Sequence, residues 1–222
     1  MAVLVAVVAC QPQRKASSPV SPIVRKHAHA DIYALDSAQS WIKLKVYRAG
    51  PLARFGHNHA ITIEQISGLL YREKSLSQSE IEFSFPVTAM VVDRAADRAE
   101  AGVDFTAAIA PEAVAGTREN MLGPKLLAAQ QYPIIKLRSV SISDTWPDLQ
   151  MVVAIKLREV ESQLTVPVHI TEQDGVLSAD GETGLSQVQL GLTPYSVLGG
   201  GLRVGDAISA RFHLVAVKTS QK

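Results

Sequence analysis

Two histidines stand close enough in the sequence to act together. His57 and His59 flank Asn58, directly before an apolar segment that begins at Ile61. In a strand, residues i and i+2 point to one face, so both imidazoles could bind Zn, Cu or Ni if further ligands joined them. The pair 27 and 29 (His-Ala-His) has the same spacing and could supply a third ligand. In the alternative interpretation, that pair lies in a disordered tether and His57 and His59 only form hydrogen bonds within a loop.

The same loop also contains groups that can recognise the polar end of a ligand. Arg54, His57, Asn58 and His59 offer charged and neutral donors to a phosphate or to a carbonyl oxygen such as that of a quinone. Arg118 lies in a segment that we expect to be helical, and it would join them if this segment covers the loop. The loop therefore supports two hypotheses, metal binding and recognition of a polar group.

Sequence motifs for catalysis are missing. The chain contains no Gly-x-Ser-x-Gly elbow, no His-Glu-x-x-His motif and no phosphate-binding loop. Residues 198–202 (LGGGL) are rich in glycine but lack a following Lys-Ser/Thr, so they indicate a turn or bulge between strands. Residues 93–100 (DRAADRAE) are typical of a solvated loop or short helix, and we assign them no chemistry. We expect a binding protein and not an enzyme.

Strands must position these loops, because the dominant period of the sequence is two. In residues 40–47, for example, Ile42, Leu44 and Val46 alternate with polar residues, which is typical of an antiparallel sheet with one face in water. The same reasoning predicts strands at residues 40–47, 61–70, 81–87, 134–143, 151–157, 164–170, 176–186 and 208–216.

One segment interrupts this strand pattern. Residues 111–130 are rich in Ala and Leu and open with Pro-Glu, so we expect a helix at 111–122 and, after Gly123-Pro124, a second short helix at 124–130. About eight strands with this helical insertion form one all-β domain over residues 31–222. Such strands make a sandwich or a closed barrel, whose interior either is filled by side chains or holds one small ligand.

Composition excludes several classes of protein. The 22 Lys and Arg residues balance 21 Asp and Glu residues, which argues against a nucleic-acid partner. Hydrophobic residues make up 47% of the chain, enough for a core, but aromatic residues only 5%. A single cysteine excludes an intramolecular disulfide, and no apolar run reaches the roughly 18 residues of a spanning helix. Nothing in the sequence indicates an oligomeric state.

The N-terminal segment has the pattern of an export signal. Residues 2–9 (AVLVAVVA) are apolar and end in a small residue before Cys10, and residues 7–10 resemble a bacterial lipobox. Residues 11–22 are rich in Pro and Ser and resemble a tether. We therefore expect a signal at residues 1–9, lipidation at Cys10, a tether at residues 10–30, and attachment to the outer membrane, facing the periplasm.

Several segments together resemble the YceI-like, polyisoprenoid-binding family of bacterial periplasmic proteins. They are residues 33–40 (YALDSAQS), 121–139 (MLGPKLLAAQQYPIIKLRS) and 166–170 (VPVHI), and Gly205-Asp206 before the last strand. The resemblance implies a lipocalin-like antiparallel barrel with helices near its mouth, which holds a long isoprenoid or quinone-like lipid and requires no cofactor. Residues 50–59 and 192–204 depart from the more familiar members.

On this interpretation the apolar faces of the strands line the ligand site. The candidates for this lining are Ile42, Leu44, Val46, Phe83, Phe85, Val153, Ile155, Val166, Val168, Phe212 and Leu214. The leading hypothesis is thus a lipid-anchored periplasmic protein that carries or sequesters a lipid. The alternatives are a metal-binding or redox accessory protein that uses His57 and His59, and a packed barrel that serves as an interaction module without a small ligand.

Overall fold

The structure is a computed structural model that describes His27 and residues 29–219. Strands dominate these residues, joined by two short α-helices and several 3-10 turns. In chain order the elements are β1 (Asp31–Leu35), β2 (Trp41–Ala49), η1 (Ala53–Phe55), β3 (His59–Ile63), β4 (Ser67–Arg72), η2 (Leu76–Gln78), β5 (Glu80–Pro86), η3 (Val87–Ala89), β6 (Met90–Val92), α1 (Ala95–Ala101), η4 (Val103–Phe105), α2 (Pro111–Leu122), β7 (Ile134–Ile142), β8 (Asp148–Leu157), β9 (Val160–Gln173), β10 (Val176–Ser186), β11 (Ser196–Val197), η5 (Leu198–Gly200) and β12 (Leu202–Lys218).

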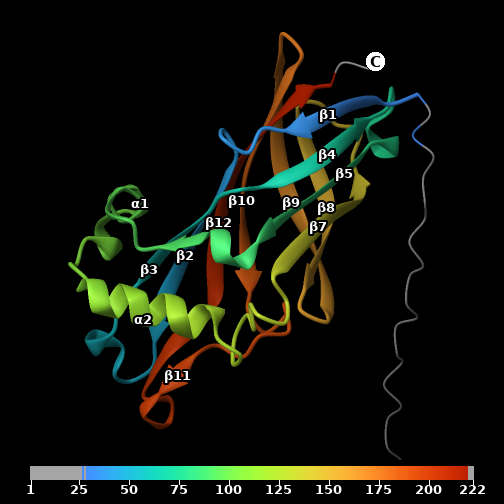
Figure 1. Cartoon of the computed structure of the whole chain (residues 1–222). Coiled ribbons are helices and arrows are strands. Elements are labelled where there is room, and N and C mark those ends of the chain that lie inside the picture. The colour runs from blue at the N-terminus through green and yellow to red at the C-terminus, as the bar shows by residue number, and fades with distance from the viewer. Residues whose placement is uncertain (1–26, 28, 220–222) are drawn as a thin grey trace, which may run out of the picture.

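Eight antiparallel strands close into a barrel (Figure 1), in the order β1-β4-β5-β7-β8-β9-β10-β12, and β12 pairs back to β1. Closure occurs at the end of β12, where Ala216 pairs with Leu35 and Lys218 pairs with Tyr33. Tyr33 is almost fully buried there against Leu177 and Ala216. The predicted all-β antiparallel barrel is confirmed, and closure distinguishes it from a sandwich.

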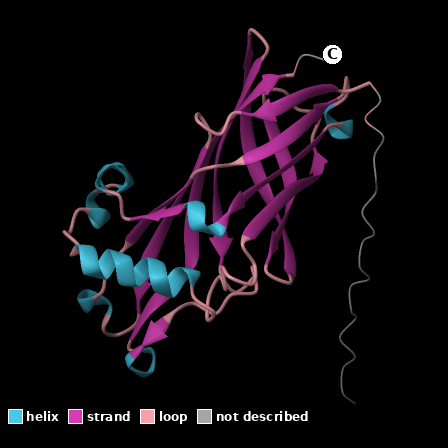
Figure 2. Ribbon diagram, viewed as in Figure 1, coloured by secondary structure: helices cyan, strands magenta, loops and turns pink. Residues whose placement is uncertain are grey.

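The other half of β12 carries additional strands. Its residues 203–213 pair with β2, which continues to β3 and then to the short β6. Helix α2 lies across this half of the molecule (Figure 1), and most of the helical segments gather at the same end (Figure 2). The barrel is therefore tightly closed at one end, while a sheet extension and helices enclose the other.

Two details of the predicted secondary structure are wrong. The strand expected at 61–70 is divided into β3 and β4, because Gln65 adopts a left-handed conformation (φ +57°) and the apolar alternation shifts from Ile63 to the fully buried Ile66. The helix expected at 111–122 matches α2, but residues 124–130 form turns in place of a second helix. Pro124 lacks the backbone donor of a helix, and Ala128 adopts a φ of +47°.

Within the described residues, we find no helix with both the length and the apolar character needed to cross a membrane. The predicted turn at residues 198–202 is confirmed as the connection of the β11–β12 hairpin, in which Ser196 pairs with Arg203 and Val197 with Leu202.

Candidate functional site

The wide half of the barrel encloses a cavity of about 470 Å³, within the range of pockets that hold a small ligand. Its wall is formed by the apolar faces of the strands, with Ala113, Met121 and Leu127 of α2 and the following turn completing one side. All the residues that the sequence suggested as a lining do line this cavity: Ile42, Leu44, Val46, Phe83, Phe85, Val153, Ile155, Val166, Val168, Phe212 and Leu214. Their contact with a lipid stays a prediction.

Further members of the wall were not predicted, although the same alternation contains them. Ile61 and Ile63 of β3, Ile135 and Leu137 of β7, and Ile208 of β12 line the cavity too. Each continues a row of inward-facing residues at a period of two, so the pattern that identified the candidates could have identified these as well.

A smaller cavity of about 80 Å³ lies toward the closed end of the barrel, beside Trp146 and Arg72. Four side chains line both cavities and lie between them: Ile81, Met151, Ala179 and Leu214. Met151 and Leu214 are buried, so the apolar interior is interrupted at this level.

Ionisable side chains line the large cavity at its open end. In the part of the chain that the structure describes, the lining includes Arg48, Arg203, His57 and His59 but neither Asp nor Glu. Arg48 continues the inward row of Ile42, Leu44 and Val46 at the end of β2, and its guanidinium donates to the carbonyl oxygen of Gly56 at 2.6 Å. An apolar ligand with one polar end would place that end here.

The residues expected to bind a polar group do not all reach the cavity. His57 and His59 line it, whereas Arg54, Asn58 and Arg118 do not. Asn58 has a structural role, since its side chain accepts from the Arg48 amide at 3.0 Å and donates to the Asp104 carbonyl at 3.1 Å. Arg118 donates to the Thr88 carbonyl at 3.0 Å, and exposed Arg54 lies over the ring of Phe55.

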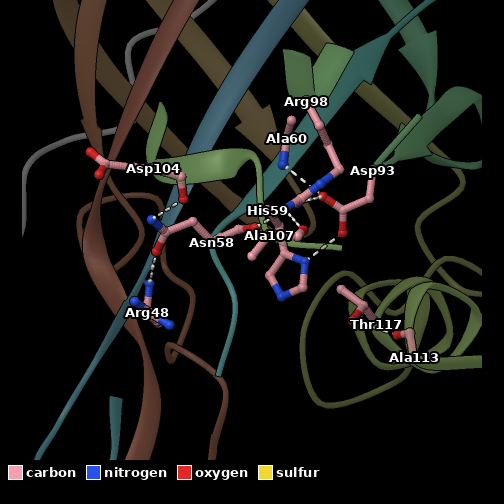
Figure 3. Close-up of polar contacts among 10 residues, drawn as sticks. All are labelled: Arg48, Asn58, His59, Ala60, Asp93, Arg98, Asp104, Ala107, Ala113 and Thr117. Atoms are coloured by element: carbon pink, nitrogen blue, oxygen red, sulfur yellow. Dashed lines mark hydrogen bonds and ion pairs between the residues drawn. The ribbon is translucent and has the colours of Figure 1, made fainter. Parts of the chain in front are cut away.

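His59 belongs to a buried polar cluster (Figure 3). Its Nδ1 lies 2.6 Å from one carboxylate oxygen of Asp93, and the other oxygen accepts from the Ala60 amide at 3.0 Å and from Arg98 at 2.7 Å. The Asp93 side chain is fully buried. Our expectation that residues 93–100 are solvated is therefore wrong for Asp93, Asp97 and Arg98, which are buried.

This cluster determines which ring nitrogen of His59 donates and which accepts a hydrogen bond. Burial alone would raise the pKa of Asp93, but hydrogen bonds from His59, the Ala60 amide and Arg98 outweigh it and hold the pKa below its ordinary value. The Asp93 carboxylate faces Nδ1, so in the neutral ring Nδ1 carries the proton and Nε2 is an acceptor. The positive charge of Arg98 already balances the carboxylate.

The described residues place no third metal ligand beside His57 and His59. His27 lies elsewhere, stacked on Tyr71 and within 3.4 Å of Glu80. Among the described residues there is no group of three or more His, Cys, Asp or Glu side chains that could hold a metal ion. Cys10, the predicted signal and most of the predicted tether lie outside the described residues.

Comparison with known proteins relates the barrel to solved structures. BcnA of Burkholderia cenocepacia is similar at a TM-score of 0.60 and 14% identity, covering 82% of this chain and 99% of that one. A polyisoprenoid binding domain from Saccharophagus degradans, implicated in plant cell wall breakdown, is similar at a TM-score of 0.56 and 9% identity, and the match covers 86% of this chain and 100% of that one. The Campylobacter jejuni YCEI protein is similar at a TM-score of 0.53 and 8% identity, and the match covers 72% of this chain and 85% of that one.

These structural similarities, at such low identity, concern the fold. A comparison with curated proteins finds no match. The sequence itself matches the model of the YceI-like domain over residues 33–216, which is most of the chain and extends from β1 into β12. The chain therefore belongs to the family of YceI-like domains.

Proposed function

We propose that this protein binds a long-chain isoprenoid or quinone-like lipid inside the barrel, and that it carries or sequesters this lipid without transforming it. The observation that supports the proposal best is the cavity of about 470 Å³, whose wall is mostly apolar and largely aliphatic. Each CH₂ group moved from water into such a wall gains about 0.8 kcal/mol. A hydrocarbon tail can therefore bind without specific contacts, although ordering a flexible chain offsets part of the gain.

The polar end of the cavity is compatible with a ligand of this kind. Arg48, His57 and His59 offer hydrogen-bond donors and acceptors where the apolar wall ends, so a lipid would lie with its tail inside and its head group at the opening. The likeness to a solved polyisoprenoid binding domain supports the isoprenoid class.

The sequence supports a location for this activity. The apolar residues 2–9 before Cys10 and the Pro/Ser-rich residues 11–22 favour export, lipidation and attachment of the barrel to the outer membrane, facing the periplasm. In that position a carrier would lie within reach of membrane lipids.

A pair of neighbouring valines on β8 allows a matched test. Val153 lines the cavity, whereas Val152 points to the opposite face of the strand. The full chain is purified without added lipid and extracted with organic solvent, and the extract is analysed by mass spectrometry. We expect a co-purified lipid in wild type and in Val152→Trp, and its loss in Val153→Trp, because the indole would project into the cavity and obstruct the path of the tail.

Direct binding of geranylgeraniol, measured by calorimetry on delipidated protein, complements the extraction. Val153→Trp should weaken the binding of geranylgeraniol at least tenfold. Its midpoint of thermal unfolding should stay close to that of Val152→Trp, which would show that the loss of binding does not come from unfolding. A wild-type protein that releases no lipid and binds no prenol would contradict the proposal, as would equal binding by the two variants.

A further inference from the structure

Two loops surround the open end of the cavity, and we call them the mouth loops: residues 48–58 and 195–203. They pack against each other, since the Leu52 amide donates to the Gly201 carbonyl at 2.8 Å. A Cβ on Gly50 would lie 2.6 Å from the Gly201 oxygen, so the close approach requires glycine there. Figures 1 and 2 place η1 and the β11–η5 hairpin, which belong to these loops, at the same end of the molecule.

The mouth loops expose apolar side chains to solvent. Phe55 is 65% exposed, Leu198 is 74% exposed and Val197 is exposed beside it. Leu198 also has a φ of +53°, a conformation that costs a non-glycine residue of order 1 kcal/mol. A strained backbone that holds a leucine in water is unfavourable for the isolated protein, and it indicates a surface that something else covers.

The same loops carry positive charge without acidic residues. Arg48, Arg54 and Arg203 are exposed, and residues 48–58 and 195–203 contain neither Asp nor Glu. Among the described residues, none of the three arginines has a carboxylate as an ion-pair partner, in contrast to Arg72, Arg94, Arg98, Arg138 and Arg211. Two acidic residues lie close to the mouth loops: the Asp104 carbonyl accepts from Asn58, and Asp206 follows Arg203 in the chain. The carboxylate of Asp206 already accepts from Ser186 and the Val188 amide.

We propose that the mouth loops dock on the surface of an anionic lipid bilayer, so that the cavity opens directly against the membrane. Phe55, Val197 and Leu198 would enter the boundary between head groups and acyl chains, while the arginines meet anionic head groups. Phe55, Val197, Arg48 and Arg203 also line the cavity, so the docked surface and its opening coincide. A lipid could then pass between bilayer and barrel without crossing water.

Sedimentation with vesicles tests this surface. The full chain carries Cys10→Ser in every sample, so that no acyl group contributes to binding. Vesicles of phosphatidylcholine with phosphatidylglycerol are compared with vesicles of phosphatidylcholine alone. We expect binding to the anionic vesicles only, and its loss near 1 M salt, where the Debye length falls to about 3 Å.

Two double variants separate the apolar and the charged contributions. The double variant Phe55→Ser/Leu198→Asn removes the apolar contacts with the bilayer. Asn is chosen at position 198 because it tolerates the left-handed backbone. Binding of this variant to anionic vesicles should fall at least about tenfold. Arg54→Gln with Arg203→Gln should weaken binding about fivefold for each arginine. Both pairs are exposed, so thermal midpoints should stay near that of the parent. Trp146→Ser removes a side chain that is 46% exposed beside the other cavity, and it should bind as the parent does.

Several results would overturn the docking proposal. Equal binding to both kinds of vesicle would show that anionic lipid is not the partner, and binding to neither would assign the patch to a protein or to another copy of the chain. Loss of binding in Trp146→Ser as large as in the mouth-loop variants would show that the effect is not local. The assay needs no lipid inside the barrel, so these outcomes leave the proposed lipid binding to be decided by extraction and calorimetry.

Discussion

His59, Asp93 and Arg98 form a hydrogen-bonded cluster around a buried carboxylate. A carboxylate buried without partners would be strongly destabilising, and here the hydrogen bonds from His59, Ala60 and Arg98 satisfy it. Because β3 supplies His59, the segment before α1 supplies Asp93 and α1 itself supplies Arg98, the cluster also ties the opening of the cavity to the helical side of the barrel.

Removing the acid should therefore destabilise the fold. Asp93→Asn leaves Arg98 as a buried charge without its counterion, and we expect the free energy of unfolding to fall by about 3 kcal/mol. Chemical denaturation measures this change. The matched control is Asp148→Asn, which breaks a His–Asp contact of 2.8 Å between exposed side chains and should be hard to distinguish from wild type. Equal losses in the two variants would contradict the importance of burial.

The pH dependence of stability follows from the same group. The pKa of Asp93 is lowered in the folded state, so its contribution is fully present above the unfolded-state pKa of about 3.9. As the pH falls below that value, the unfolded chain binds the proton first, and the contribution is lost through the lower folded pKa. Asp93→Asn should therefore lose stability less steeply than wild type below about pH 4, which denaturation curves at several pH values can check.

Sequence reasoning identified His59 but not its partners, for a physical reason. Asp93 and Arg98 lie in a run of alternating acidic and basic residues, whose composition is typical of solvated segments. Their burial depends on tertiary contact with β3, which no local pattern records. Arg48, in contrast, continues the alternation of Ile42, Leu44 and Val46, so its inward direction could have been predicted.

At the scale of elements, the contact between β9, β10 and β12 depends on a glycine. Gly181 pairs with Phe212, and a Cβ on it would lie 2.4 Å from the Phe212 ring and 2.5 Å from the Pro167 carbonyl oxygen. The absence of a side chain lets the ring of Phe212, which lines the cavity, lie over the strand.

Replacing this glycine should disturb the wall of the cavity. We expect Gly181→Ala to cost about 2 kcal/mol of unfolding free energy, because either the ring or the β9 backbone must move. Gly184→Ala on the same strand meets no atom within 4 Å and should leave stability unchanged or slightly raise it. Thermal and chemical unfolding compare the variants, and an equal effect at the two positions would show that the close contact is not decisive.

The sequence predicts strands well where one alternation of apolar and polar residues persists. It predicts their bounds less well where the apolar residues shift from one set of alternate positions to the other. Residues 176–186 match β10 in both bounds, and the turn at Asp174-Gly175 precedes the strand, although Asp180-Gly181, which is also a turn signal, lies within it. Residues 61–70 were read as one strand, since a left-handed residue such as Gln65 has no reliable sequence signal. The additional pairing of β12 with β2 could not be predicted either, because it depends on which strands meet beyond the barrel.

At the scale of the whole molecule, anchoring would hold the mouth loops near a membrane. If Cys10 is lipidated, labelled palmitate should enter the wild-type protein and leave Cys10→Ala unlabelled, with the variant shifting from the membrane fraction to the soluble periplasmic fraction. Gel fluorography and fractionation measure the two effects. Labelling that persists in Cys10→Ala would contradict the predicted lipoprotein processing.

The large cavity has a blind end, because four side chains separate it from the small one: Ile81, Met151, Ala179 and Leu214. If the barrel carries a lipid as proposed, a chain that enters tail first between the mouth loops would have to leave head first through the same opening, and a second lipid could not follow it inside. Such a carrier would exchange lipid only with the membrane that its opening faces, and the whole protein would have to turn or move to reach a second membrane.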